Sequence, residues 1–191
     1  KSMRRAGLIF IRQSHRCDLV STRLTRRACG NQRAATGVRP ITCLPFRTTR
    51  VAGTRRLCEF LTRLPAFPQT LVCASAIGYY GHRGDERLAE ESPSGSGFLA
   101  EACREWERAT EPALQHGIRV VNLRIGIVLS PTGGAMAKLL PPFRLGLGGP
   151  LGRGTQVMSW IALDDLVGAI QHILLTPSLR GPVNAVAPNP A

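Results

Sequence analysis

The sequence is poor in several features, and each shortage excludes a class of protein. Its six cysteines are scattered with no Cys-x-x-Cys pair, which supports neither a zinc site nor a dense disulfide framework. No apolar run approaches the ~20 residues that span a bilayer, so we expect no membrane segment. Cys58, Cys73 and Cys103 fall on apolar faces, which predicts buried, reduced thiols and a cytoplasmic protein.

Acidic residues are almost missing from the first quarter of the chain. Residues 1–50 hold twelve Lys or Arg and one acid, Asp18, for a net charge of +11, whereas residues 51–191 carry only +2. Residues 1–46 also show no sustained period, although Leu8–Ile11 is a short apolar run that could form a strand. We interpret residues 1–46 as a basic leader that is disordered or foreign to the fold.

The leader has a second interpretation, a nucleic-acid-binding arm. Aromatic side chains that would stack on bases are scarce in it, with only Phe10 and Phe46 available. We therefore rank nucleic acid below a small molecule as the expected partner.

The rest of the chain alternates helical and strand patterns. A helical face begins near Leu57 and is ended by Pro65. Later segments are predicted as strands at 71–76, 119–129, 157–161 and 182–186, and as helices from 99, at 135–140 before Pro141-Pro142, and at 164–175. This order predicts an α/β fold with parallel strands and right-handed crossovers over residues 47–191.

The segment Leu71–Gly81 is where chemistry is expected. Its apolar start suits a strand buried in a parallel sheet, and ligands bind beyond the carboxyl ends of such strands. Ser75, Tyr79 and Tyr80 follow at that end. The alternative is a plain core strand whose small residues allow close packing.

A glycine-rich run at 146–154 is similar to a dinucleotide-binding fingerprint, but no strand leads into it and Pro150 interrupts it. We interpret it as a flexible loop that could cover a ligand.

Several motifs together resemble one family. They are Ala74–Gly81, Asp85-Glu86, Glu91–Pro93, Trp106-Glu107, Arg124–Leu129, Gly133–Ala135, Pro141–Pro150, Ser159–Ile161 and Asp164–Leu166. Over about Arg50–Pro190 the chain resembles the atypical extended short-chain dehydrogenases/reductases of the NAD-dependent epimerase/dehydratase family. The resemblance implies a Rossmann-like doubly wound parallel sheet that binds NADP(H), followed by a small substrate domain.

The resemblance also implies site residues. Arg50 would lie near the cofactor, Ser75 would stand beside the nicotinamide, and the strand end with Arg124, Gly126 and Val128 would approach its nicotinamide end. Taken alone, Arg50 could be a surface charge, Ser75 a small core residue and Arg124 a strand-end ion pair.

The chain departs from the family pattern at its start. No G-x-x-G-x-x-G precedes Arg50, where the only glycines are Gly7, Gly30 and Gly37, so the first half of the nucleotide domain is expected to be missing or replaced. The substrate domain is likewise expected to be absent, which makes the Rossmann sheet partial. We expect homodimerisation or aggregation through the open sheet edge unless residues 1–46 cover it.

A second departure concerns catalysis. The superfamily's Tyr-x-x-x-Lys couple is absent, since the only lysines are Lys1 and Lys138. If a proton donor exists, we predict Tyr79 or Tyr80, with Ser75 as its hydrogen-bonding partner. The sequence leaves open an NADP(H)-dependent epimerase/oxidoreductase-like protein of impaired activity, a non-catalytic NADP(H)-binding or regulatory protein, and nucleic-acid binding through the leader.

Overall fold

The computed structural model describes residues 8–11, 47–149 and 156–191. In chain order its elements are β1 (Leu8–Ile11), the π-helical η3 (Arg47–Ala52), α2 (Gly53–Thr62), β2 (Thr70–Ala76), the 3₁₀ turn η4 (Ile77–Tyr80), α3 (Phe98–Arg108), α4 (Glu111–Gln115), β3 (Arg119–Ile125), β4 (Ile127–Leu129), α5 (Gly134–Arg144), β5 (Trp160–Ala162), α6 (Leu163–Leu175) and β6 (Gly181–Ala185). No helix in these ranges is long and apolar enough to cross a bilayer.

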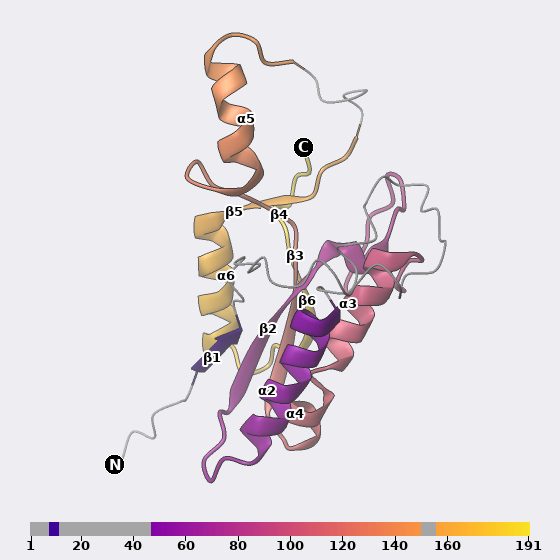
Figure 1. The fold of residues 1–191 in the computed structure, drawn as a ribbon, viewed down its shortest axis with the longest axis vertical. Helices are drawn as coiled ribbons and strands as arrows, with labels where there is room; N and C mark the ends of the chain where they lie inside the picture. The colour runs from indigo at the N-terminus through magenta and orange to yellow at the C-terminus, as the bar shows by residue number, and fades with distance from the viewer. Residues whose placement is uncertain (1–7, 12–46, 150–155) are drawn as a thin grey trace, which may run out of the picture.

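Four strands form a parallel sheet in the order β1-β2-β3-β6, and β4 and β5 form a second parallel pair. Helix α6 covers one face of the larger sheet, and α2, α3 and α4 cover the other (Figure 1). The predicted α/β class with parallel strands is therefore confirmed. The carboxyl ends of β2, β3 and β6 meet at one edge of the sheet, where the candidate site lies.

Strand β1 comes from the basic leader. It runs parallel to the outer edge of β2, with Leu8 opposite Thr70 and Ile11 opposite Cys73. The short apolar run that could form a strand does so, and the β2 edge that we expected to be open is paired over these four residues. The remaining leader residues, 1–7 and 12–46, lie outside the described residues.

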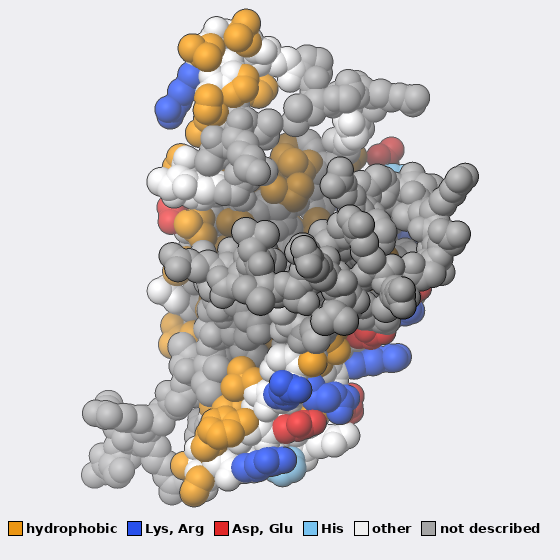
Figure 2. Space-filling model, in the orientation of Figure 1, with side chains coloured by type: hydrophobic (Ala, Val, Ile, Leu, Met, Phe, Trp, Pro, Cys, Tyr) orange, Lys and Arg blue, Asp and Glu red, His pale blue; other side chains and the backbone are white. Residues whose placement is uncertain are grey.

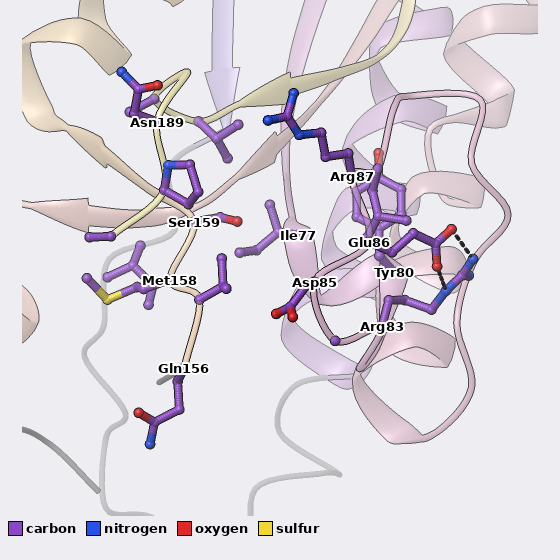
Figure 3. Close-up of a pocket in the computed structure, with 18 of the residues that line it drawn as sticks. Ile77, Tyr80, Arg83, Asp85, Glu86, Arg87, Gln156, Met158, Ser159 and Asn189 are labelled. Carbon is purple, nitrogen blue, oxygen red and sulfur yellow. Dashed lines mark hydrogen bonds and ion pairs between the residues drawn. The ribbon is translucent and has the colours of Figure 1, made fainter. Parts of the chain in front are cut away.

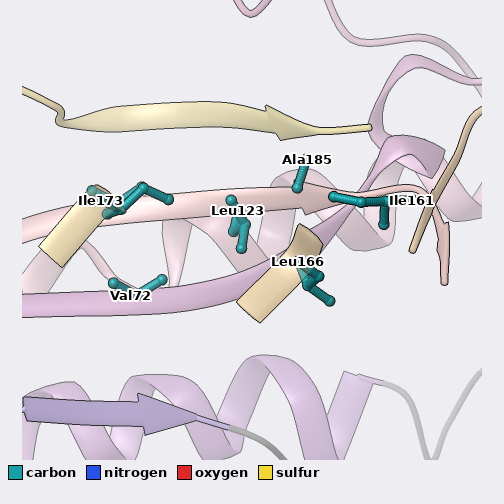
Figure 4. Close-up of a cluster of buried hydrophobic side chains, with 7 residues drawn as sticks. Val72, Leu123, Ile161, Leu166, Ile173 and Ala185 are labelled. Carbon is teal, nitrogen blue, oxygen red and sulfur yellow. The ribbon is translucent and has the colours of Figure 1, made fainter. Parts of the chain in front are cut away.

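Alternate residues of the strands supply the two cores, as a strand buried on both faces requires. Leu71 and Val120 point to the α2 and α4 side, and Val72 and Val121 to the α6 side. Figure 4 shows the α6 cluster, which consists of Val72, Val121, Leu123, Ile161, Leu166, Ile173 and Ala185.

Three apolar residues of the amphipathic helices are exposed. Phe60 and Leu99 are each 58% exposed and Val167 is 47% exposed. Figure 2 shows hydrophobic side chains interleaved with charged ones over the end of the molecule where α2 and α4 lie. Smaller residues of the same helices are buried instead, namely Cys58 in α2 and Ala100 and Ala102 in α3.

Three predicted elements have wrong boundaries. The strand predicted at 157–161 forms only at Trp160–Ala162. Helix α5 does not stop before Pro141-Pro142 but continues to Arg144. The two prolines donate no N–H bond to the preceding turn, but their carbonyls still accept bonds from Leu145 and Leu147. The strand predicted at 119–129 is divided at Gly126, where the chain leaves the main sheet for the β4–β5 pair.

Candidate functional site

A row of polar side chains crosses the sheet near its carboxyl edge. Ser75 in β2 lies opposite Arg124 in β3, and Arg124 lies opposite Asn184 in β6. Residues in register on neighbouring parallel strands share a face of the sheet. The row faces α3, because Glu107 of that helix bonds both Ser75 and Arg124.

The central contact is a two-pronged ion pair between Arg124 and Glu107. Arg124 Nε and Nη2 donate to Glu107 Oε1 and Oε2, each at 3.0 Å, and Ser75 Oγ donates to Oε1 at 2.6 Å. Arg124 is only 3% exposed. Burial alone would lower the pKa of Arg124, but its hydrogen bonds to Glu107 and Tyr80 outweigh this and raise it. The guanidinium therefore stays charged.

Tyr80 extends this network toward the loop after η4. Its hydroxyl accepts a hydrogen bond from Arg124 Nη1 at 2.9 Å and lies 2.7 Å from Asn184 Oδ1 and 3.0 Å from the Ala89 carbonyl oxygen. A hydroxyl has a single proton, so it donates to only one of these two oxygens at a time. Glu90 completes the network, accepting Arg124 Nη1 at its carbonyl (3.0 Å) and the Asn184 N–H at its carboxylate (2.8 Å).

The predicted bond between Ser75 and a tyrosine is not the one that forms, because the Ser75 proton goes to Glu107. Tyr79 contributes its ring, whose centroid lies 3.5 Å from Arg124 Cζ. The two tyrosine rings meet edge to face, with centroids 5.4 Å apart. The proposed proton donation by Tyr79 or Tyr80 stays a prediction.

The remaining predicted residues lie in packing positions. Arg50 stacks on Trp106, with Cζ 5.3 Å from the ring centroid. A Cβ at Gly126 would come within 2.8 Å of the Ser159 carbonyl oxygen, so only glycine allows this crossing from β3 to β4. Val128 pairs with Ile161 and packs against the α6 cluster. Cofactor contacts by Arg50, Ser75, Arg124, Gly126 and Val128 stay predictions.

A cleft of about 1100 Å³ opens beyond this edge of the sheet (Figure 3). Tyr80 and Asn184 belong to its wall together with the apolar Ile77 and Ile127. Other parts of the wall come from the loop 82–88, from 156–159 and from the last residues, 186–191. Gly149, from the glycine-rich run at 146–154, also lines the cleft. Parallel sheets bind ligands in this position.

Sequence reasoning missed Glu107, Glu90 and Asn184. Glu107 stands in the Trp106-Glu107 motif that we quoted for the family resemblance, which was an available signal. Asn184 lies 104 residues from Tyr80 in the chain, and no local pattern pairs them.

Comparison with known proteins identifies the family. The model of the NAD dependent epimerase/dehydratase family matches residues 32–185. The chain belongs to this family. An epimerase family protein of Mycobacterium bovis is 51% identical over 121 residues, 63% of this chain and 40% of that protein. The epimerase family protein SDR39U1 of Homo sapiens is 37% identical over 145 residues, 75% of this chain and 49% of its own length.

Solved structures of the family share the fold. A nucleoside-diphosphate sugar epimerase from Corynebacterium glutamicum superposes with a TM-score of 0.74 and 43% identity, covering 83% of this chain and 34% of that one. Human SDR39U1, solved with NADPH, superposes with a TM-score of 0.68 and 36% identity. The match covers 74% of this chain and 48% of that one. The predicted Rossmann-like fold is thereby confirmed. The chain spans less than half the length of these relatives.

Proposed function

We propose that the chain is an NADP(H)-dependent epimerase/oxidoreductase-like protein whose cleft holds the nicotinamide end of the cofactor beside a small-molecule substrate. The cleft at the carboxyl edge of the parallel sheet is the observation that carries this proposal. Two of its polar wall residues, Tyr80 and Asn184, are held by neighbouring residues rather than left free to move. The human relative solved with NADPH supports NADP(H) over NAD(H).

The residues present fit only one half of such a cofactor. The cleft offers apolar walls at Ile77 and Ile127 and polar groups at Tyr80 and Asn184, which suit a nicotinamide and its ribose. The pyrophosphate half fits poorly, because no glycine occurs between Ile11 at the end of β1 and Gly30. The glycines after the first strand normally allow the backbone to approach the phosphates. We therefore expect weak cofactor binding.

A second candidate is a non-catalytic NADP(H)-binding or regulatory protein. Neither tyrosine of the chain is followed four residues later by a lysine. Tyr80, on the cleft wall, already has its hydroxyl bonded to Arg124, which is the kind of contact that holds a group in place. A substrate-dependent change in NADPH absorbance would distinguish an oxidoreductase from this alternative. Conversion of a nucleotide sugar to its epimer would distinguish an epimerase, which returns the hydride and leaves no net change in NADPH.

The first experiment is a thermal-shift titration with NADPH, using NADH as the comparison. A ligand at about a hundred times its dissociation constant stabilises a binder by about 2.7 kcal/mol, so we expect a rise of several degrees with NADPH and a smaller one with NADH. Ile127→Glu, which places a carboxylate in the cleft, should abolish the shift. Leu175→Glu, at a residue 84% exposed and outside the cleft lining, is the matched control. A cooperative melt with no NADPH shift would contradict cofactor binding.

A further inference from the structure

Four residues close a ring of hydrogen bonds at the cleft wall. Arg124 donates to the Tyr80 hydroxyl and to the Glu90 carbonyl, and Asn184 contacts the same Tyr80 hydroxyl and the Glu90 carboxylate. Two members are strand residues in register, and the other two come from η4 and the loop that follows it. The ring therefore joins the sheet to η4 and to the loop that follows it.

The hydrogen bonds that join residues 82–91 to the sheet pass through this ring. Between Gly81 and Gly97 the chain turns without regular structure, and residues 82–88 line the cleft. Within that stretch Arg83 and Glu86 bond each other, which does not fix the loop to the sheet (Figure 3). The contacts that reach the sheet are those of Leu88, Ala89 and Glu90 with the side chains of the ring.

Arg124 is placed to organise the ring and not to meet a ligand. Each of its three guanidinium nitrogens already donates, to Glu107, to Tyr80 or to Glu90. Its 3% exposure leaves little surface for a further partner. Glu107 accepts hydrogen bonds from both Nε and Nη2 of Arg124, and this two-pronged contact fixes the direction in which Nη1 points.

We propose that Arg124 is a positioning residue, which with Glu107 latches the loop 82–91 onto the sheet through Tyr80 and so sets the wall of the cleft. Tyr80 is the central member, since its hydroxyl accepts from Arg124 and donates to either Asn184 Oδ1 or the Ala89 carbonyl. Removing that one oxygen breaks the ring of hydrogen bonds, while the aromatic group of the side chain continues to fill its buried site.

Tyr80→Phe and Tyr79→Phe form a matched pair of variants for the test. Both remove one phenolic oxygen from adjacent tyrosines, but the contact that the structure gives Tyr79 with Arg124 is through its ring, which phenylalanine keeps. Amide hydrogen exchange of the whole chain without ligand is the measurement. Tyr80→Phe should speed exchange in residues 82–91 by about tenfold, while β2, β3 and α6 keep the parent rates. Tyr79→Phe should leave the loop at the parent rate.

Parent-like exchange of the loop in Tyr80→Phe would overturn the latch. Uniform acceleration across the loop, β2, β3 and α6 would also overturn it, because that result indicates a general structural role. If Tyr80→Phe does not fold, Glu90→Ala tests the same ring from a half-buried loop position and should give the same local increase. An unchanged loop in Glu90→Ala would then refute the proposal.

The consequence for ligand binding rests on the proposed function. With the wall loosened, NADPH should bind Tyr80→Phe about tenfold more weakly than it binds the parent, whereas Tyr79→Phe should retain the parent affinity. A parent chain that binds no NADPH would refute the proposed function, and the exchange of the loop would still decide the latch. Equal NADPH affinity in the parent and Tyr80→Phe would overturn the claim that the latch sets the cleft wall.

Discussion

At the scale of single residues, burial decides the chemistry of the described thiols. Cys58, Cys73 and Cys103 are buried, which confirms the prediction that these thiols lie in the core. Desolvation is the main cause that raises the pKa of Cys58 and Cys103 to about 11 and of Cys73 to about 12. At neutral pH these side chains are therefore protonated, and the thiolate that would react with an electrophile is rare.

We predict that iodoacetamide at about pH 8 alkylates these three cysteines at least a hundredfold more slowly in the native chain than in urea, since the unfolded thiols ionise near about pH 8.5. The folded state favours the protonated thiol, so stability should be full below about pH 8.5 and fall as the pH rises above it. Mass spectrometry of the labelled peptides separates these sites from the other cysteines. Native labelling of Cys73 at the unfolded rate would contradict the prediction.

At the scale of elements, one side chain ties the end of α6 to the start of β3. Arg119 Nη1 donates to the carbonyls of Ile173, Thr176 and Leu179 at 2.8–3.1 Å, and its Nε donates to Thr70 at 3.2 Å. The last carbonyls of a helix have no partner within it, and a cation there also interacts favourably with the negative end of the helix dipole. Arg119 thus caps α6 against the sheet edge.

Arg119→Ala should lower the free energy of unfolding by about 1–3 kcal/mol, because several half-buried carbonyls lose their donor. Arg119→Lys should recover only part of this, since an ammonium cannot reproduce the planar fork. Urea denaturation measures both, with the exposed Arg180→Ala as the control. A loss in Arg119→Ala no larger than in Arg180→Ala would rule out the capping role.

At the scale of the whole molecule, the outer strand of the sheet comes from the basic leader. β1 pairs only the first part of β2, at Thr70–Cys73, and separates that edge from solvent. An unpaired strand edge offers free N–H and C=O groups to a second chain. The proposed tendency to dimerise or aggregate should therefore depend on whether β1 is present.

A variant that begins at Arg47 should form dimers or larger aggregates, whereas one that lacks only residues 1–5 should behave as the parent does. Size-exclusion chromatography with light scattering gives the masses directly. A monodisperse monomer with a sharp thermal transition in the variant that begins at Arg47 would show that the β2 edge needs no cover.

Local patterns were sufficient wherever one stretch of chain carries the signal. The apolar runs at β2 and β3 predicted buried parallel strands, and the helical period predicted α3 and α6. Patterns were insufficient to say which residues of a helix face inward. Phe60 and Leu99 fit the helical period but stay exposed, because the buried side of α2 is formed by Thr54, Cys58 and Leu61 and that of α3 includes Cys103 and Trp106.

The sequence by itself determined the class of fold, the family and the edge of the sheet where a ligand would bind, since these depend on periodicity and on motifs of neighbouring residues. Tertiary structure alone decided which residues Arg124 bonds, because its partners Glu107, Tyr80 and Glu90 are 17, 44 and 34 residues away in the chain. It also decided that Leu8–Ile11 belongs to the sheet, since β1 pairs with a strand about sixty residues later. Strand pairing and buried charge pairs are contacts between distant segments, and only the folded chain brings them together.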